Sequence, residues 1–156
     1  VVPIVSALDM RNAVMSRLPE MDWVIKAAAV GDYRPISAAS DKLKKKDGEL
    51  NIALTRNPDI LAEIGASKRQ NQTVCGFSME TRDLLENSRA KLEKKNCDLM
   101  IANNLKVEGA GFAGDTNVVT LLRRDGSNEA LPLMEKTTLA DRILDEMLAL
   151  HTQKRR

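Results

Sequence analysis

Short apolar runs alternate along the chain with segments in which apolar residues recur at helical spacing. A continuous apolar run bounded by polar or turn residues is typical of a strand buried within a sheet. Such strands are predicted at residues 1–5, 21–30, 73–78 and 98–103. A further strand at residues 50–54 alternates apolar and polar positions, which predicts a place partly at an edge.

The segments between these strands predict helices. Helical patterns occupy residues 7–18 and 81–95, and another helix begins at Asn57-Pro58-Asp59. This tripeptide combines a capping residue, a proline suited to the first turn and an acid near the positive end of the helix dipole. Repeated strand–helix units indicate a parallel sheet with helices on both faces.

The alternation changes in the last third of the chain. Residues 118–123 and 130–134 flank Asp125-Gly126, a strong hairpin signal, and residues 137–150 predict a closing helix. We therefore expect a single α/β domain over residues 1–156. Its predicted architecture is a Rossmann-like three-layer fold with a mainly parallel sheet and a C-terminal β-hairpin plus helix.

Composition narrows the class of partner. The chain has 24 basic and 22 acidic residues, so its net charge of +2 gives no global field that attracts nucleic acid. No apolar run has membrane-spanning length, and no signal peptide is recognisable. Cys75 and Cys97 lack metal-site spacing and fit reduced thiols. We expect no nucleic-acid partner, no membrane partner and a cytoplasmic location.

Candidate binding residues gather where the predicted strands end. Ligands of open α/β sheets bind beyond the carboxyl ends of the strands. The strand at 21–30 leads into Gly31-Asp32, the strand at 73–78 contains Phe77 near its end, and a lysine-rich run begins at Lys42. Asp32 is either a turn former or a ligand contact, and Phe77 is either a core residue or the wall of a base pocket. On composition alone, the lysine-rich run is a solvated loop.

Two further lysines, Lys91 and Lys95, lie one helical turn apart on one face of a predicted helix. Like charges at that spacing repel unless an anion lies between them or neighbouring acids such as Glu86 and Glu93 relieve the repulsion. Together with Lys42, this pair has the charge to neutralise a triphosphate. Asp41 and Glu80 are candidates to hold Mg²⁺ through water, although the metal ligands stay unassigned.

Residues 109–114, with the sequence Gly-Ala-Gly-Phe-Ala-Gly, match a dinucleotide-binding pattern. That pattern requires a helix directly after it, whereas residues 118–122 read as a strand. We therefore interpret this segment as a glycine-rich flap and not as a dinucleotide site.

Five motifs in this order resemble one known family. They are Ala27-Ala28-Ala29-Val30-Gly31-Asp32-Tyr33-Arg34-Pro35, Lys42-Leu43-Lys44-Lys45, Asn57-Pro58-Asp59-Ile60, Gly76-Phe77-Ser78-Met79-Glu80-Thr81 and Asp98-Leu99-Met100-Ile101-Ala102-Asn103-Asn104. The family is phosphopantothenoylcysteine synthetase, the ligase half of the bacterial bifunctional coenzyme A biosynthesis flavoprotein. The resemblance covers essentially the whole chain.

The resemblance implies a CTP- and Mg²⁺-dependent ligation of 4′-phosphopantothenate to L-cysteine in coenzyme A biosynthesis. The implied course runs through an acyl-cytidylate, with release of pyrophosphate and then CMP. Lys42 matches the catalytic position. The implied CTP-binding positions are Ala27, Ala28, Asp32, Lys42, Pro58, Asp59, Ile60, Phe77, Lys91 and Lys95. The family also implies a homodimer.

The family departs from this sequence at the N-terminus, where it begins with a glycine-rich strand–helix segment that has no counterpart here. We therefore expect residues 1–156 to be an N-terminally incomplete ligase domain, fused in the parent protein to an FMN-dependent phosphopantothenoylcysteine decarboxylase. The alternative is a non-catalytic nucleotide-binding or dimerisation module, which would release no pyrophosphate.

Overall fold

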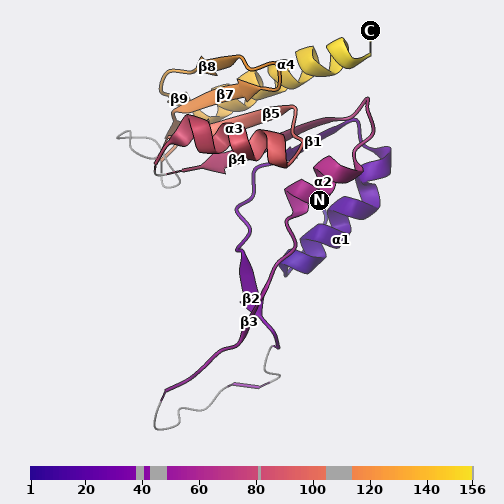
Figure 1. The fold of residues 1–156 in the computed structure, drawn as a ribbon, viewed down its shortest axis with the longest axis vertical. Helices are drawn as coiled ribbons and strands as arrows, with labels where there is room; N and C mark the ends of the chain where they lie inside the picture. Colours follow the sequence, from indigo (N-terminus) through magenta and orange to yellow (C-terminus); the bar gives the residue numbers. More distant parts are fainter. Residues whose placement is uncertain (38–40, 43–48, 81, 105–113, 156) are drawn as a thin grey trace.

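A five-stranded sheet forms the centre of the protein in the computed structural model, which describes residues 1–37, 41–42, 49–80, 82–104 and 114–155. Its strand order is β1-β4-β5-β7-β8 (Figure 1). The bounds are β1 Trp23–Lys26, β4 Thr73–Met79, β5 Leu99–Asn103, β7 Val119–Arg123 and β8 Asn128–Ala130. β1, β4 and β5 run parallel, and the β7–β8 hairpin joins β5 antiparallel.

Helices cover both faces of this sheet. Their bounds are α1 Ala7–Arg17, α2 Ile60–Ser67, α3 Leu84–Lys94 and α4 Lys136–Lys154, with a 3₁₀ turn at Leu18–Glu20. Ile64 of α2 and Leu92 of α3 pack with Val74 of the sheet in one core, to which α1 contributes Val14. On the other face, Met147 of α4 packs against Leu121 of β7. The predicted three-layer α/β fold with its hairpin and closing helix is confirmed.

Two glycines allow α2 to approach its neighbours closely. A Cβ on Gly76 of β4 would lie 2.5 Å from Leu61 Cδ2, and a Cβ on Gly65 of α2 would overlap the carbonyl oxygen of Lys95. The first contact brings α2 onto the sheet, and the second brings it against the end of α3. Together they place the start of α2 beside β1 and β4.

Several predicted boundaries are wrong. Residues 1–5 form no strand and are largely exposed, and no strand in the described part of the chain pairs with them. The strand predicted at 21–30 ends at Lys26, and the apolar residues that follow cross the end of the sheet without regular structure. The helix predicted at 81–95 begins only at Leu84, and the strand predicted at 50–54 is shifted to β3, Leu54–Arg56. The short pair β6, Thr116–Asn117, and β9, Met134–Glu135, was not predicted.

The residues that follow the glycine-rich pattern at 109–114 form β6 and β7. Of the pattern itself, only Gly114 lies within the described residues. Because strands and not a helix come next, the dinucleotide interpretation is excluded, as the sequence predicted. The interpretation of this segment as a flap stays a prediction, since its residues 109–113 lie outside the described part of the chain.

A narrow antiparallel arm projects from the body of the protein (Figure 1). It consists of β2, Tyr33–Pro35, β3 and the adjoining residues 36 and 50–53, where Ile36 N donates to Ala53 O. Its apolar side chains are exposed: Tyr33, Ile36, Leu50, Ile52 and Leu54 are each more than half accessible to solvent. Two strands alone bury too little to be stable, so this arm requires support at its base or from another surface.

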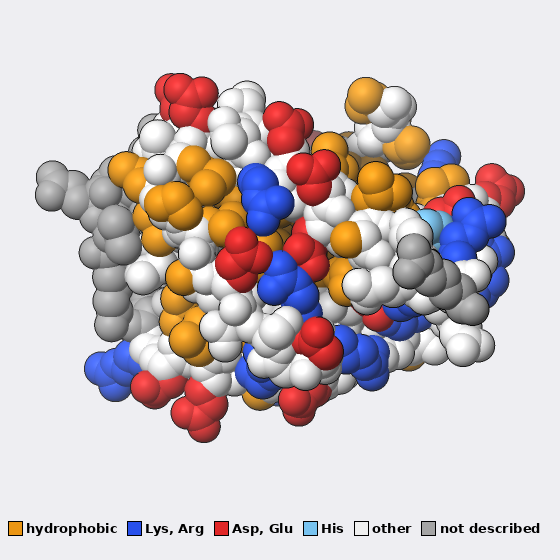
Figure 2. All heavy atoms as spheres, turned by 90° about the horizontal axis from the view of Figure 1, so that it is seen from above, with side chains coloured by type: hydrophobic (Ala, Val, Ile, Leu, Met, Phe, Trp, Pro, Cys, Tyr) orange, Lys and Arg blue, Asp and Glu red, His pale blue; other side chains and the backbone are white. Residues whose placement is uncertain are grey.

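The outer surface mixes charges of both signs. Lysine and arginine side chains alternate with aspartate and glutamate on the face shown in Figure 2, which is consistent with the small net charge. Within the described residues, no helix is both long and apolar enough to cross a membrane.

Candidate functional site

A cavity of about 130 Å³ lies at the carboxyl ends of β1 and β4, where the chain enters α2. Parallel strands place their carboxyl ends at one edge, and this edge is the usual ligand position in such sheets. Six of the ten predicted site residues line the cavity, namely Asp32, Pro58, Asp59, Ile60, Phe77 and Lys95. These residues are separated by up to 63 positions, counted from Asp32 to Lys95, and the fold brings them to one place.

The start of α2 forms one wall. Asp59 is the capping residue, and its carboxylate accepts a hydrogen bond of 3.1 Å from the backbone N–H of Ala62. Pro58 precedes it and ends the extended segment that follows β3. A helix is present here as predicted, but it starts two residues later: Asp59 and not Asn57 is the cap, so Pro58 lies before the helix and Ile60 is its first residue. This arrangement directs the positive end of the helix dipole toward the cavity.

Asp59 also pairs with a cation across the cavity. Its carboxylate lies 3.2 Å from Lys95 Nζ, at the end of α3. Partial burial opposes ionisation of Asp59, but the hydrogen bond from Ala62 and the charge of Lys95 together hold its pKa below the ordinary value. The carboxylate is therefore the internal counter-ion of the cavity.

A second cation, Lys26, was not among the predicted site residues. It is the last residue of β1, lines the same cavity, and donates a 2.8 Å hydrogen bond from Nζ to the carbonyl oxygen of Ala28. Burial and the nearby Lys95 lower the pKa of Lys26, while Asp59 partly opposes that shift. The alternation of side chains along β1 could have identified Lys26, because Lys26 shares a face of the strand with Val24, which packs on the α2 side of the sheet.

Asn57 is another cavity residue outside the predicted set, and it ties the arm to the site. Its side-chain amide donates to Gly31 O at 2.8 Å, and its backbone N–H donates to Asp32 O at 2.8 Å. Arg34 of β2 donates to Arg56 O at 2.6 Å and to Asn57 Oδ1 at 3.2 Å. These bonds fix the base of the arm against the turn that carries Asp32.

The remaining predicted residues lie outside this cavity. Ala27 and Ala28 line neighbouring cavities. Lys91 forms an ion pair with Glu80, just beyond the end of β4, and its side chain is 42% exposed. Lys42 is exposed and belongs to the connection between β2 and β3, beyond the paired part of the arm. A single chain therefore does not bring Lys42 to the cavity that contains Lys95.

The structure gives no direct support for the suggested Mg²⁺ ligands. Glu80 is engaged with Lys91, and Asp41 lies with Lys42 in the connection of the arm. Among the described residues, no group of three or more histidine, cysteine, aspartate or glutamate side chains is arranged to hold a metal ion. Mg²⁺ usually binds proteins through few carboxylates and through substrate phosphates, so the cavity's fit to a magnesium–nucleotide stays a prediction.

Comparisons with known proteins agree with this architecture. The family described as DNA/pantothenate metabolism flavoprotein C-terminal domain matches residues 1–150. The coenzyme A biosynthesis bifunctional protein CoaBC of Bacillus subtilis (strain 168) is 45% identical over 152 residues. That match covers 97% of this chain but only 37% of the relative, so the chain spans well under half the length of that protein.

Solved structures show the same fold. The crystal structure of the C-terminal domain of a CoaBC protein has a TM-score of 0.77 and 36% identity, and the match covers 97% of this chain and 68% of that one. A Cab2 mutant in complex with phosphopantothenate-cysteine has a TM-score of 0.76. Its match covers 98% of this chain and 53% of that one, and its identity of 21% supports likeness of fold alone.

Proposed function

The chain belongs to the family of the DNA/pantothenate metabolism flavoprotein C-terminal domain, and we propose that it is the ligase domain that joins 4′-phosphopantothenate to L-cysteine in coenzyme A biosynthesis. The proposed reaction depends on CTP and Mg²⁺. The observation that carries this proposal is the gathering of six of the ten predicted site residues around one polar cavity at the ends of β1 and β4. The 45% identity to a CoaBC protein supports the same assignment.

The proposed reaction has two steps. A carboxylate oxygen of phosphopantothenate forms a bond to the α-phosphorus of CTP while the bond to pyrophosphate breaks, and the bonding electron pair leaves with pyrophosphate. The amino group of cysteine then attacks the acyl carbon, loses a proton and displaces CMP. Charge accumulates on the phosphoryl oxygens in the first step, so cations near them lower its barrier.

Lys95 and Lys26 are positioned to supply part of that positive charge. Both line the cavity, and the start of α2 adds its dipole and free backbone N–H groups. Both cations interact with the carboxylate of Asp59. We propose that the phosphates of the nucleotide replace Asp59 in part as counter-ions of the two lysines, and that Phe77 forms a wall of the same cavity.

We further propose that the protein acts as a homodimer in which the arm reaches a second copy. The arm exposes five large apolar side chains, which favours its burial against another protein surface. Because Lys42 lies beyond the paired part of that arm and outside the cavity of its own chain, its proposed catalytic role requires delivery to the cavity of the partner. We also propose that this domain is fused, in its parent protein, to an FMN-dependent phosphopantothenoylcysteine decarboxylase.

We also retain as proposals an N-terminally incomplete ligase domain and a cytoplasmic location. β1 is an edge strand whose second side pairs with no described strand, and Ile25 at this edge is 39% exposed. An additional strand at this edge would complete the sheet beside the cavity. Both cysteines are free and buried, which suits a reducing compartment.

The experiment compares nucleotide binding with turnover. We expect CTP to raise the melting temperature of the chain much more than ATP at equal concentration. A ligand stabilises the folded state more strongly the more tightly it binds that state, and the proposed site is selective for CTP. Pyrophosphate release is then measured with phosphopantothenate and cysteine, in a longer chain that includes the sequence preceding residue 1 in its gene. Equal shifts with CTP and ATP would contradict CTP dependence. Binding of CTP without pyrophosphate release from the longer chain would favour a non-catalytic nucleotide-binding module, whereas a dimerisation module would bind neither nucleotide.

A further inference from the structure

The turn that carries Asp32 is held in place by a residue from another wall of the polar cavity. After β1 ends at Lys26, the chain runs without helix or strand until β2 begins at Tyr33. Asn57 binds two consecutive carbonyl oxygens of this segment. Gly31 O accepts from its side-chain amide and Asp32 O accepts from its backbone N–H, each at 2.8 Å. Since all three residues line the cavity, the position of Asp32 there depends on Asn57.

The side chain of Asn57 is available for this contact because the helix that follows does not use it. Asp59 caps α2 with its own carboxylate. Asn57 precedes a proline, which disfavours the helical region for its backbone and keeps it outside the helix. The half-buried amide of Asn57 therefore lies between the arm and the turn, where it bridges the two.

Arg34 of β2 determines which way the amide of Asn57 faces. Its guanidinium donates to Asn57 Oδ1 at 3.2 Å and to the backbone carbonyl of Arg56 at 2.6 Å. A guanidinium has donors and no acceptor, so the amide presents its oxygen to Arg34 and its nitrogen to Gly31 O. Without Arg34, nothing opposes the reverse orientation, in which the amide oxygen faces the carbonyl oxygen of Gly31 and the hydrogen bond to the turn is lost.

We propose that Arg34 is a positioning residue for nucleotide binding, an inference that rests on the proposed function. Arg34 does not line the polar cavity and acts through Asn57, which holds the turn of Gly31 and Asp32 against the start of α2. Because Arg34 belongs to β2, the base of the arm sets the geometry of the cavity in its own chain. This role is separate from the contact with a second copy that is proposed for the exposed apolar side chains of the arm.

Arg34→Met tests this role together with two companion variants. Arg34→Lys keeps the positive charge and hydrogen-bond donors but loses the planar guanidinium. Arg56→Met is the matched control, because Arg56 is the other arginine of β2 and β3 and its guanidinium lies 6.0 Å from the ring centre of Tyr33. This substitution keeps the backbone carbonyl to which Arg34 donates. Titration calorimetry measures CTP affinity, and circular dichroism verifies that each variant is folded.

We expect Arg34→Met to weaken CTP binding about tenfold, which is the effect of losing one charge-assisted hydrogen bond. Arg34→Lys recovers part of this loss, because an ammonium group can still donate to Asn57 Oδ1. Arg56→Met binds CTP as the wild type does. The melting temperature changes little in all three variants, since the arm lies outside both hydrophobic cores.

A double-mutant cycle tests whether Arg34 acts through the turn. Asp32→Ala removes the side chain that the turn presents. If Arg34 only positions that turn, adding Arg34→Met to Asp32→Ala weakens CTP binding by less than about twofold further, because both substitutions remove the same interaction. Combined with Lys95→Met, which removes a charge at the end of α3, the fold-losses multiply. A general loss of stability would multiply in both pairs.

Amide hydrogen exchange adds a measurement that needs no nucleotide. The N–H of Asn57, which bonds to Asp32 O, should exchange faster in Arg34→Met than in the wild type or in Arg56→Met. Three results would overturn the inference: unchanged exchange at Asn57, unchanged CTP affinity in Arg34→Met, or fold-losses of Arg34→Met and Asp32→Ala that multiply.

The proposed function fails in a different way. If CTP binds as expected and the cycle shows the coupling, but the longer chain releases no pyrophosphate, the positioning role of Arg34 stands and the ligation does not. If the ligation proceeds while Arg34→Met binds CTP normally, the proposed function stands and the positioning role does not. A wild-type chain that binds no CTP would contradict both.

Discussion

The carboxylate of Asp59 lies 3.2 Å from Lys95 Nζ while it also accepts a hydrogen bond from the first turn of α2. One acid thus joins the start of one helix to the end of another across the candidate nucleotide cavity. The side chain of Lys95 is 23% exposed and that of Asp59 is 51% exposed, so solvent weakens their attraction. The pair therefore holds positive charge at the site without adding much to stability.

Lys95→Met should separate the contribution of this lysine to nucleotide binding from its contribution to stability. We expect CTP affinity to fall about tenfold, because a phosphate loses one charge-assisted contact. The free energy of unfolding should change by less than about 1 kcal/mol, as is usual for partly exposed ion pairs. Titration calorimetry and urea unfolding measure the two quantities. Lys94→Met, at an exposed neighbouring lysine, should leave both unchanged; an equal loss of CTP affinity in this control would point to general charge and not to the cavity.

Lys26→Met tests the cation that the sequence patterns did not identify. Burial lowers the pKa of Lys26, which means that the folded state disfavours its charged form. Replacement by an apolar side chain of similar length should therefore leave thermal stability unchanged or raise it, whereas CTP affinity should fall. A melting temperature that drops together with CTP affinity would instead assign Lys26 a structural role through its bond to Ala28 O.

The difference between Lys26 and Asp59 shows what the sequence could and could not predict. The start of α2 follows from adjacent residues, because Asn57-Pro58-Asp59 supplies its own capping and chain-direction signals. Lys26 is embedded in an apolar run, and its importance depends on which face of β1 meets α2. The arm was missed for a related reason: Tyr33 pairs with Arg56 across a long connection, and no local pattern specifies that partner.

The length of the predicted strand at 21–30 illustrates the same limit. An apolar run does not distinguish residues that continue a strand from residues that line a cavity. Ala27 and Ala28 do the latter, at the point where the chain leaves the sheet. Motif resemblance marked both residues as site residues, but only the fold shows that they face cavities other than the one beside Lys95.

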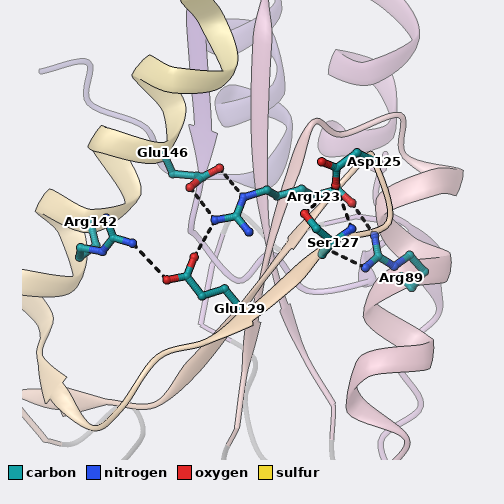
Figure 3. Close-up of polar contacts among 7 residues, drawn as sticks. All are labelled: Arg89, Arg123, Asp125, Ser127, Glu129, Arg142 and Glu146. Atoms are coloured by element: carbon teal, nitrogen blue, oxygen red, sulfur yellow. Dashed lines mark hydrogen bonds and ion pairs between the residues drawn. The ribbon is translucent and has the colours of Figure 1, made fainter. Parts of the chain in front are cut away.

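A separate set of ion pairs holds the β7–β8 hairpin on α4 (Figure 3). Arg123 donates to both carboxylate oxygens of Glu146, at 2.5 and 2.7 Å, and to Glu129 at 2.7 Å. These carboxylates raise the pKa of Arg123, chiefly through the hydrogen bond to Glu146. From the other side, Arg89 of α3 donates to the backbone carbonyls of Gly126 and Ser127 in the hairpin turn.

Arg123→Met should destabilise the protein by about 2 kcal/mol, because it leaves the nearly buried Glu146 without its bidentate partner. CTP affinity should not change, since the hairpin lies away from the polar cavity. Urea unfolding and titration calorimetry measure the two effects. Arg142→Met is the control, because Arg142 lies 3.3 Å from Oε1 of Glu129 and its side chain is 42% exposed. It should cost less than about 0.5 kcal/mol, and an equal loss in both variants would contradict the special role of Arg123.

Asp98 should dominate the acid sensitivity of the fold. Its carboxylate lies at the start of β5, accepts from Val74 N at 2.9 Å, and pairs with Lys68 Nζ at 2.8 Å and Lys154 Nζ at 2.7 Å. Burial opposes ionisation, but the two ammonium groups and the Val74 N–H together hold the pKa of Asp98 below its ordinary value. When a carboxyl group has a lower pKa in the folded state than in the unfolded state, its ionisation stabilises the protein at any pH above the unfolded pKa, about 3.9 for Asp. This contribution is lost as the pH falls through the folded pKa.

We therefore expect Asp98→Asn to destabilise the protein by about 3 kcal/mol at pH 7, because two ammonium groups lose their shared counter-ion. The difference from wild type should shrink only below about pH 4, where the Asp98 carboxyl first becomes protonated in the unfolded state and then, at lower pH, in the folded state. Urea unfolding of both proteins between pH 7 and pH 3 measures this convergence. Asp125→Asn, at a fully exposed turn, serves as the control and should show a much smaller difference at every pH. A gap between wild type and Asp98→Asn that stays constant down to pH 3 would show that the loss comes from packing, and not from the charge that joins β5 to α2 and α4.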